Sequence, residues 1–550
     1  GEGFMQRFTL GKLAIVCAVA LMLILPSHSH AFRAPDDTSA PTPMRSGEKS
    51  KEVVTSVNLK PVLSRDLNLP VTGDVVKAAK DLVNLNLAAT RAGGEGPSLS
   101  TRDQSTESTL AAAGSVFEEK RVQSDNLGFT HVRLAQYYNG LLVVGAEVIV
   151  HVNSENVIYQ VNGKYVPEIT VAPEPSIKAD KALQVGLDEQ QGKPGLRVSA
   201  EPSLVIYGNH LAYHYVLSHE GAEIGQWWYY VDAHTGKLLF RYDNIKRACP
   251  TASGSNQFVG GMRLEGEDGN YYEALGWLET GGNYYFYSWD NLWGLYDEDA
   301  NSGAGDCEQN ATSNWGTLDR PAVSAGLNFE DIQAYVSSVL GRNSFDDAGG
   351  FAWAIVHYQD NLCNAYWNGS TFLFGDGDGT SSCKPLTVMD IAAHEYGHAI
   401  TQYTSDLVYS YEPGALNESY SDIMGTLVEF AYQLDGTSVY PDALPGYADW
   451  LCGEDAWGPL AGDALRDLRD PQRYMQPSYY HGTYWYFGSG DNGGVHTNSG
   501  VANHAFYLLS EGAPAGNNDG HPHDEIVGIG YVAAGQVAMR ANMLYHTAND

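Results

Sequence analysis

Basic residues are scarce in this chain, and runs apolar enough to cross a membrane are absent after its first residues. The 550 residues include 32 Lys/Arg against 66 Asp/Glu, which gives a formal net charge of −34 at pH 7. A chain this negative repels a phosphate backbone, so we expect no nucleic-acid partner. Residues 13–25 form one apolar run, which is too short for a stable membrane anchor.

That apolar run has the features of a secretory signal peptide. Met5 is the expected start of translation, and Arg7 and Lys12 supply a positive region before the run. The small-residue motif Ser-His-Ala follows it, which predicts a signal peptide at residues 5–31 and a secreted, extracellular product. We therefore expect no membrane partner after cleavage.

Cysteine is also scarce, with six residues in all. In the oxidising compartment of a secreted protein the thiols outside the signal peptide are candidates for disulfides. Cys363 and Cys383 would close a short loop and are the preferred pair, with Cys249 and Cys307 as the second. Cys452 either is unpaired or pairs with a cysteine beyond the end of this sequence.

The motif HEYGH places His394 and His398 four residues apart. Residues at this spacing share one face of a helix, so both imidazoles can bind one metal ion, with Glu395 placed to take a proton from the bound water. Glu418, in the motif NESYSD, would be the third protein ligand and would leave one position open, as in a catalytic zinc site. Asp422 could orient a ligand imidazole through its free N–H.

Four further features accompany these motifs, namely NAYW at 364–367, FGDGDG at 374–379, Arg466 before an Asp-Pro pair and DNGGVHTNSG at 491–500. Together they resemble the thermolysin family of secreted zinc metalloproteases, and its pseudolysin and vibriolysin branch in particular. The resemblance covers most of residues 128–550. It implies a monomeric zinc endopeptidase of α+β fold that acts on proteins and peptides. A β-rich lobe and a helical lobe would form its two sides, with zinc in the cleft between them.

The same resemblance assigns roles at the reaction centre. It places His496 and Tyr409 beside the developing oxyanion, and Asp491 as the group that positions His496. Arg466 would bind a substrate carbonyl, although Arg469 and Arg473 lie close to it in the sequence. The residues expected to hold the peptide in extended form are Asn364 and the backbone of Ala365.

The resemblance also implies a specificity pocket and a second metal. An apolar pocket that selects Leu, Phe, Ile or Val after the scissile bond would consist of Ile391, Leu386 and Leu465. Calcium prefers carboxylate and carbonyl oxygens, and its expected ligands are Asp390, Glu429, Asp449, Glu454 and the backbone oxygen of Leu451. We expect one calcium ion rather than two, and the alternative is a solvated acidic loop.

Two further stretches resemble the propeptide modules of this family, one beginning GFTHVR and one ending VDAHTG. They imply an intramolecular chaperone and inhibitor, removed between about residues 243 and 254, rather than a permanent N-terminal domain. The expected division is a signal peptide at 5–31, an N-terminal propeptide segment at 32–127, propeptide modules at 128–247, a catalytic N-terminal lobe at 248–400 and a truncated C-terminal lobe at 401–550. Within it we expect a helix near residues 75–87, a strand at 141–152 and a tight turn at Asn162-Gly163.

Charge follows the same division. Residues 249–550 contain 40 Asp/Glu and 8 Lys/Arg, whereas the first 248 residues contain 26 and 24. Self-repulsion of this size favours high ionic strength, so a halophilic or marine enzyme is expected. Two rival functions are a zinc aminopeptidase, for which no residues that would bind a free amino terminus are evident, and a calcium-stabilised binding protein with a silent metal site.

Overall fold

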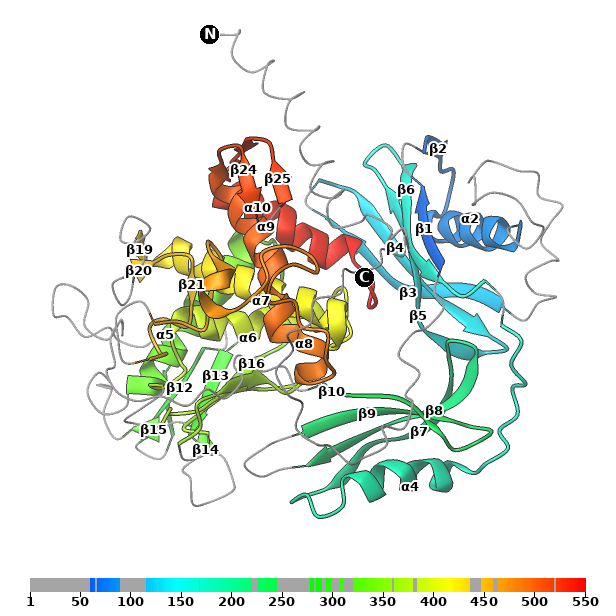
Figure 1. Ribbon diagram of the computed structural model, residues 1–550, viewed down its shortest axis with the longest axis horizontal. Coiled ribbons are helices and arrows are strands. Elements are labelled where there is room, and N and C mark those ends of the chain that lie inside the picture. Colours follow the sequence, from blue (N-terminus) through cyan, green and yellow to red (C-terminus); the bar gives the residue numbers. More distant parts are fainter. Residues whose placement is uncertain are drawn as a thin grey trace, which may run out of the picture.

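The chain forms two parts that lie side by side in the computed structural model (Figure 1). N-terminal strands make up one part, and the helices of the C-terminal half dominate the other. The expected signal peptide and the expected cleavage region after residue 244 lie outside the described residues. The structure describes residues 60–64, 67–89, 115–125, 127–167, 169–219, 225–244, 277–280, 283–288, 293–297, 306–307, 309–310, 320–358, 361–378, 383–435, 447–458, 463–518 and 521–550.

A ten-stranded sheet, almost entirely antiparallel, makes up the N-terminal part. Its strands are β1 (Lys60–Ser64), β2 (Leu69–Pro70), β3 (Ser115–Ser124), β4 (Thr130–Tyr138), β5 (Leu141–Val152), β6 (Val157–Tyr165), β7 (Arg197–Tyr207), β8 (His210–His219), β9 (Gly225–Asp232) and β10 (Leu238–Asp243). The long strand β5 pairs with β4 and β6, and in parallel with β7 where Val143 faces Ile206. It thereby joins two smaller antiparallel sheets.

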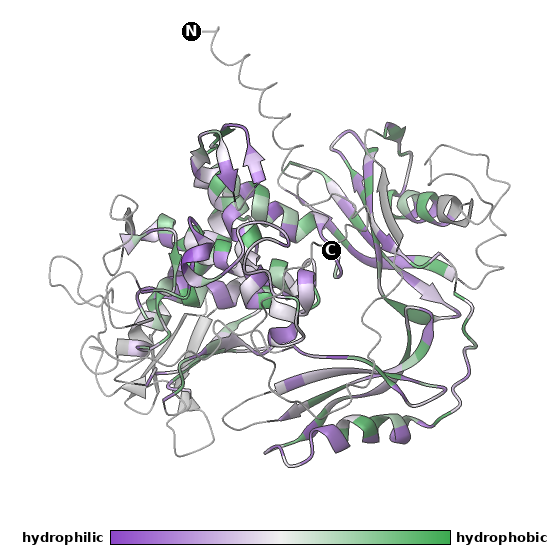
Figure 2. Cartoon of the chain, viewed as in Figure 1, coloured by the Kyte–Doolittle hydropathy of each residue, from purple (hydrophilic) through white to green (hydrophobic). Residues whose placement is uncertain are grey.

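One helix packs on each of these smaller sheets. Helix α2 (Val75–Ala89) covers β3–β6 around the buried residues Val83 and Phe117. Helix α4 (Ala179–Glu189) covers β7–β9 around Tyr215 and Tyr229. Apolar residues follow one stripe of a helix that packs on a sheet, and Figure 2 shows both apolar and polar bands on these two helices.

A second sheet of eight strands begins the other part. Strands β13, β16 and β18 pair in parallel, and β17 completes the described order antiparallel to β18. The strands of this sheet are β11 (Trp277–Thr280), β12 (Asn283–Ser288), β13 (Trp293–Asp297), β14 (Asp306–Cys307), β15 (Gln309–Asn310), β16 (Ala352–Val356), β17 (Ala365–Trp367) and β18 (Phe372–Phe374).

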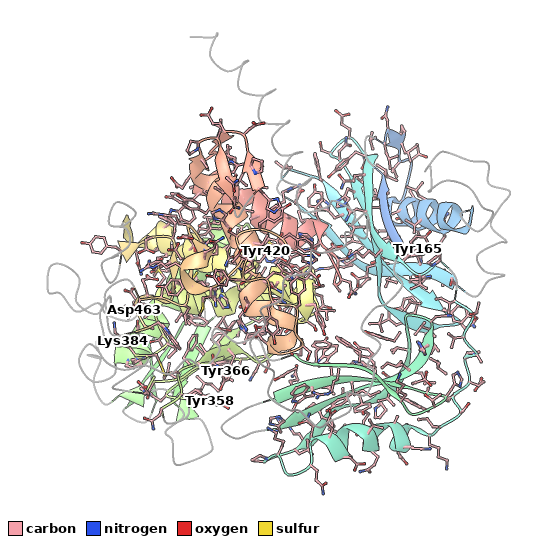
Figure 3. The ribbon with its side chains drawn as sticks, viewed as in Figure 1. Tyr165, Tyr358, Tyr366, Lys384, Tyr420 and Asp463 are labelled. Atoms are coloured by element: carbon pink, nitrogen blue, oxygen red, sulfur yellow. A yellow bond between two sulfur atoms is a disulfide. The ribbon has the colours of Figure 1, made fainter. Side chains whose placement is uncertain are left out.

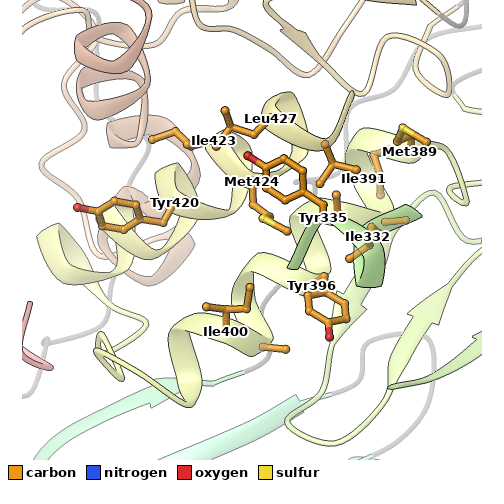
Figure 4. Packing of buried hydrophobic residues seen from close by; sticks show 14 of the residues in the cluster. Ile332, Tyr335, Met389, Ile391, Tyr396, Ile400, Tyr420, Ile423, Met424 and Leu427 are labelled. Atoms are coloured by element: carbon orange, nitrogen blue, oxygen red, sulfur yellow. The ribbon is translucent and has the colours of Figure 1, made fainter. Parts of the chain in front are cut away.

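The helices of this part share one large apolar core. Figure 4 shows Ile391 and Ile400 of one helix packed among Met424 and Leu427 of a second and Ile332 of a third. The helices are α5 (Arg320–Ser338), α6 (Met389–Gln402), α7 (Tyr411–Tyr432), η3 (Pro471–Tyr474), α8 (Asp491–Asn498), α9 (Gly500–Glu511), α10 (Tyr531–Arg540) and the π-helical turn η4 (Ala541–Tyr545). Short two-stranded pairs join them, made by β19 (Leu434–Asp435), β20 (Tyr447–Ala448), β21 (Leu451–Cys452), β22 (Arg466–Asp467), β23 (Gly512–Ala513), β24 (Gly516–Asn518), β25 (His521–His523) and β26 (Ile526–Val527).

Contacts join the two parts of the molecule at two places. Tyr420 of α7, labelled in Figure 3, contacts Nε2 of His546 at 2.8 Å. The backbone oxygen of His546 accepts a hydrogen bond of 2.8 Å from Arg133 of β4. At the other contact, Nδ2 of Asn492 on α8 donates to the backbone oxygen of Asp243, the last residue of β10, at 2.9 Å. The N-terminal sheet therefore touches the helices near the predicted reaction centre.

The α+β fold expected from the sequence is confirmed, as are the helix near residues 75–87 and the strand at 141–152. The turn predicted at Asn162-Gly163 is wrong, because both residues lie inside β6. Glycine is needed at position 163 for another reason: a Cβ there would collide with the backbone oxygen of Glu147 on β5. Among the described residues, none of the helices is long and apolar enough to span a membrane.

The preferred disulfide, Cys363–Cys383, is present. Cys249 lies outside the described residues, so the second predicted pair stays a prediction. Cys452 is buried and forms no disulfide among the described residues, which is compatible with both alternatives.

Candidate metal centre

Two buried helices, α6 and α7, supply the metal-binding side chains. Every residue of α6 from 389 to 401 is buried, and so are most residues of α7. The helices approach closely at Gly397, where a Cβ would lie 2.7 Å from the Cα of Ser421. Glycine inside HEYGH is therefore required by the contact between the helices.

The ligand atoms of His394, His398 and Glu418 lie within 4.8 Å of one another, and all three side chains are buried. The two Nε2 atoms are 3.0 Å apart. Oxygens of Glu418 lie 3.5 Å from Nε2 of His394 and 3.3 Å from Nε2 of His398. Tetrahedral zinc with bonds of about 2.0–2.1 Å separates its ligand atoms by about 3.3 Å. The three side chains therefore fit a zinc ion with one position left for water or substrate.

The other ring nitrogen of each histidine has a fixed partner. Nδ1 of His394 lies 2.8 Å from Oδ1 of Asp422, and Nδ1 of His398 lies 2.8 Å from Oδ1 of Asn417. Because these oxygens only accept, each Nδ1 carries the proton and each Nε2 keeps its lone pair for a metal. Burial lowers the pKa of His398 to about 4, which keeps it neutral. Asn417 is adjacent to Glu418 in NESYSD, but the sequence analysis missed its role.

Glu395 is buried beside these ligands. The backbone N–H of Trp367, on β17, donates to its Oε2 at 2.7 Å, and its Oε1 has no hydrogen-bond partner among the described residues. Burial, followed by the charge of Glu418, raises the pKa of Glu395 well above its usual value. A carboxylate with a raised pKa and a free oxygen is well suited to take up a proton.

Tyr409 and His496 lie on the other side of Glu418. The Tyr409 hydroxyl donates to Oε1 of Glu418 and lies 3.2 Å from Nε2 of His496. Asp491 accepts from Nδ1 of His496 at 2.6 Å. Burial disfavours the imidazolium, but Asp491 and Glu418 outweigh it and raise the pKa of His496 to about 9. The structure thus brings two donors together at one side of the metal ligands.

Arg466 lies in the same buried network. Its Nε donates to Oδ2 of Asp422 at 2.7 Å, so Asp422 connects a zinc ligand to this guanidinium. Nδ2 of Asn503, on α9, donates to the same Oδ2 at 2.7 Å. Arg473 instead pairs with Asp467 at 3.5 Å. Of these two arginines, Arg466 is the one that contacts Asp422. Asn503 lies outside the motifs in the sequence, so motif spacing does not predict its contact with Asp422.

A small cavity opens between the metal ligands and Arg466. Two of the three predicted specificity residues, Ile391 and Leu465, line it, whereas Leu386 is buried nearby without lining it. Cys452 also lines the cavity, which the sequence analysis did not anticipate. The complete lining is Asp390, Ile391, His394, Asp422, Gly425, Cys452, Gly453, Leu465 and Arg466. Ala365 is buried in β17 directly after Asn364, two residues before the Trp367 N–H.

A second acidic group lies at the far end of α7. Carboxylate oxygens of Glu429, Glu454 and Asp455 lie within 4.8 Å of one another. Both oxygens of Glu429 and of Glu454, and Oδ2 of Asp449, are buried without a hydrogen-bond partner in the described residues. Burial, followed by the surrounding carboxylates, raises the pKa of Glu429 and of Glu454 well above its usual value. Unpartnered buried carboxylate oxygens fit a hard cation such as calcium.

The other predicted calcium ligands lie around this group in different ways. Asp390 accepts from the backbone N–H groups of Ile391 and Gly453. Asp449 accepts from the backbone N–H of Leu451 at 2.6 Å. Asp455, which directly follows Glu454 in the chain, belongs to this group although it was absent from the predicted set.

Models of known families match three segments of the chain. "Thermolysin metallopeptidase, catalytic domain" matches residues 266–402, "Thermolysin metallopeptidase, alpha-helical domain" matches residues 405–550, and "Fungalysin/Thermolysin Propeptide Motif" matches residues 116–165. A thermolysin of Alicyclobacillus acidocaldarius subsp. acidocaldarius is 34% identical over 452 residues, which is 77% of this chain and 78% of the relative. This chain belongs to the thermolysin family.

Another relative in the thermolysin family is a bacillolysin of Brevibacillus brevis, 34% identical over 404 residues, or 70% of this chain and 69% of the relative. Among solved structures, the precursor of protealysin, a metalloproteinase from Serratia proteamaculans, matches with 30% identity and a TM-score of 0.32 over 40% of this chain and 67% of that one. With the family assigned and the ligand set in place, the protein is a thermolysin-like zinc metalloendopeptidase with a propeptide.

Proposed function

We propose that this protein is the precursor of a secreted, monomeric endopeptidase that uses Glu395 as its general base. The observation that carries this proposal is the free Oε1 of Glu395 beside three converging metal ligands. Zinc, when bound, lowers the pKa of its water and polarises the scissile carbonyl. Glu395 takes the proton of that water and later delivers it to the leaving nitrogen.

His496 and Tyr409 act on the charge that develops at the carbonyl oxygen. Both donors contact carboxylates, Tyr409 the buried Glu418 and His496 Asp491. One such donor typically contributes about 2.7–4 kcal/mol to lowering the barrier. Asp491 holds the His496 imidazole in place by the 2.6 Å contact. Arg466, held by Asp422, would bind a substrate carbonyl, and Asn364 with Ala365 would hold the peptide in extended form.

The cavity supports a preference for cleavage on the amino side of Leu, Phe, Ile or Val. Ile391 and Leu465 give it apolar walls next to the metal ligand His394, and Leu386 is buried in the same apolar core. An apolar side chain that follows the scissile bond would be desolvated there. Sequencing the peptides released from casein tests this preference, and new amino termini of mixed polarity would contradict it.

The acidic group is proposed to hold one structural calcium ion. The proposed ligands are Asp390, Glu429, Asp449, Glu454 and the backbone oxygen of Leu451, to which the structure adds Asp455 as a candidate. Their unpartnered oxygens support this assignment.

The N-terminal sheet is proposed to act as chaperone and inhibitor until it is cut off. Its residues Tyr230 and Tyr242 pack in one apolar cluster with Tyr409 and Val495, so it contacts the proposed oxyanion donor. We propose the division expected from the sequence, with a signal peptide at 5–31, a propeptide at 32–127 and 128–247, and catalytic lobes at 248–400 and 401–550. The family matches at residues 116–165, 266–402 and 405–550 support a propeptide followed by two catalytic lobes.

The substitution Glu395→Ala tests the mechanism. We expect casein cleavage to fall by a factor of about 10²–10⁴, with zinc content unchanged because the three ligands remain. Uncut precursor should accumulate if processing is autocatalytic. Glu511→Ala, at the exposed end of α9, is the matched control and should cleave normally. Unchanged casein cleavage by Glu395→Ala would refute the role of this residue.

A further inference from the structure

Exposed apolar side chains concentrate in one loop of the C-terminal part. Among the described residues, fourteen large hydrophobic side chains are exposed, and six of them lie between residues 475 and 487. Phe487 is 74% exposed and Tyr480 is 49% exposed. A folded chain rarely leaves such a concentration uncovered unless the surface has a binding role.

The rings of this loop contact one another. Tyr480 stacks on His481 with ring centroids 4.1 Å apart, Trp485 lies 4.8 Å from Tyr480, and Phe487 lies 5.2 Å from His481. Tyr484 adds a fifth ring at the same turn and has a φ of 70°, while His481 has a φ of 58°. Side chains rarely adopt this backbone conformation, and it persists where the surrounding structure enforces it. We call Tyr480, His481, Tyr484, Trp485 and Phe487 the aromatic surface.

Two hydrogen bonds attach the aromatic surface to the helix that carries His496. The backbone N–H of Tyr486 donates to Oδ1 of Asn498 at 2.9 Å, and Nδ2 of Asn498 donates to the oxygen of Tyr486 at 3.0 Å. Asn498 is buried on α8, two residues after His496. The Tyr480 hydroxyl also reaches Glu412, in the first turn of the helix that carries Glu418, at 3.5 Å. The surface is therefore continuous with the reaction centre.

Charge sets this loop apart from the rest of its half of the chain. Residues 471–490 contain no Asp or Glu and a single basic residue, Arg473, although residues 249–550 contain 40 acids. An uncharged aromatic surface has no affinity for cations or phosphates beyond the weak attraction of ring faces. Apolar side chains of a flexible chain are the partner that it fits, since rigid aromatic rings bind these with little loss of conformational entropy.

We propose that the aromatic surface is a second substrate-binding site, which binds apolar side chains of a polypeptide substrate outside the cleft. This inference rests on the proposed endopeptidase function. The aromatic surface is attached to α8, the helix that carries His496. A long unfolded substrate bound at the reaction centre can therefore also contact the aromatic surface, and these contacts would strengthen its binding. A peptide that only fills the cleft would not reach these rings.

The test compares two substrates and two double variants of the secreted protein. Tyr480→Ser/Phe487→Ser removes the most exposed rings, and Val527→Ser/Val532→Ser, whose valines are 69% and 57% exposed, is the matched control. We expect the first variant to raise KM for casein about ten-fold, as loss of an aromatic anchor does at an interface. Its kcat for casein and its kcat/KM for a tetrapeptide with Leu after the scissile bond should stay within about two-fold. The control variant should leave the KM and kcat for both substrates unchanged.

Each other outcome overturns the proposal. An equal loss for casein and the tetrapeptide would mean that the loop only supports His496. An unchanged KM for casein would mean that the rings do not bind substrate. If the unaltered protein binds phosphatidylcholine vesicles or cellulose and the first variant does not, the rings bind that other partner instead. Failure of the unaltered protein to cleave either substrate would instead refute the proposed endopeptidase function.

Discussion

Buried carboxylates are neutralised in two different ways in the two parts of this molecule. In the N-terminal sheet they lie next to bases. Glu147 of β5 contacts Nζ of Lys120 and lies 3.0 Å from Nη1 of Arg133. Burial alone would raise the pKa of Glu147, but these two bases outweigh it and lower the pKa. The buried charge of Glu147 is therefore matched by side chains of opposite sign.

In the catalytic part, the carboxylate oxygens of Glu429 and Glu454 at the end of α7 have no hydrogen-bond partner among the described residues. Burial and the neighbouring carboxylates raise the pKa of Asp449 to about 6, and that of Glu429 and Glu454 well above the usual value. A region with 40 acids and 8 bases has few side-chain cations to place beside them. A bound cation would supply positive charge to these carboxylates, which is the basis of the proposed calcium site.

The contact between the parts follows the same rule. The N-terminal sheet supplies bases to the other part, because Arg133 donates to the backbone oxygen of His546 and Lys164 donates to that of Asn549. Arg540 of the other part pairs with Asp125 of the N-terminal part. Burial would raise the pKa of Asp125, but contacts with His131, the backbone of Phe129 and Arg540 outweigh it and lower the pKa to about 2. The propeptide thus provides positive charge to an acidic partner.

Removal of calcium should produce the largest change, and only in the catalytic part. An unpaired buried charge costs several kcal/mol, and about 2–4 °C of melting temperature corresponds to each kcal/mol. We expect a calcium chelator that leaves zinc bound to lower the melting temperature by about 10 °C or more. The measurement is differential scanning calorimetry of the Glu395→Ala precursor, which cannot digest itself.

A double variant separates calcium loss from other effects of the chelator. Glu429→Gln/Glu454→Gln removes two of the buried charges, so its melting temperature should depend far less on the chelator. A precursor that melts at the same temperature with and without the chelator would remove the calcium site from the proposal.

Breaking an ion pair of the N-terminal sheet should have the next largest effect. Arg133→Met leaves Glu147 with Lys120 alone and removes the donor to His546. Loss of one partner of a buried pair costs about 3–5 kcal/mol, so urea unfolding of the Glu395→Ala precursor should show a loss of this order. Lys80→Met is the control, because its pair with Glu118 is largely exposed and should contribute about 1 kcal/mol or less. Equal losses in both variants would show that burial of the pair is unimportant.

The sequence predicted most of the metal centre because its signals are local. Spacing of four residues places His394 and His398 on one helix face. The family motifs predicted that Glu418, Asp422 and Arg466 belong to the same site, where the structure places them. Asn503 was missed because tertiary folding alone brings it to Asp422. Asp455 follows the predicted ligand Glu454 directly, but nothing local distinguishes it from the many other acids of this part.

The incorrect turn at Asn162-Gly163 has a different origin. Asn-Gly is a strong local signal for a hairpin, yet here tertiary contacts override it. Asn162 bonds His151 and the backbone oxygen of Tyr545, and Gly163 lies against β5. No local pattern could reveal a partner nearly four hundred residues away in the chain.

Acid should weaken the N-terminal sheet by a smaller amount, through the buried His131–His151 pair. The two Nδ1 atoms are 2.7 Å apart, so they can share one proton and a second would break the contact. Burial, followed by the charge of His131, lowers the pKa of His151 to about 3, against an ordinary 6.5. The groups that face this pair are Asp125, Arg133, Tyr159, Asn162, Arg540 and Tyr545.

The sign follows from proton uptake. Between pH 6.5 and 3 the unfolded chain binds a proton at residue 151 that the folded chain does not, so stability falls as pH falls. From pH 6.5 to 5 this amounts to about 2 kcal/mol. In urea unfolding of the Glu395→Ala precursor, His151→Gln should reduce the pH dependence by this amount over that interval. His210→Gln, at a partly exposed histidine paired with Asp232, should leave it unchanged. If His151→Gln keeps the full dependence, then acid acts on the precursor through other groups, and the histidine pair is not the point at which the propeptide responds to pH.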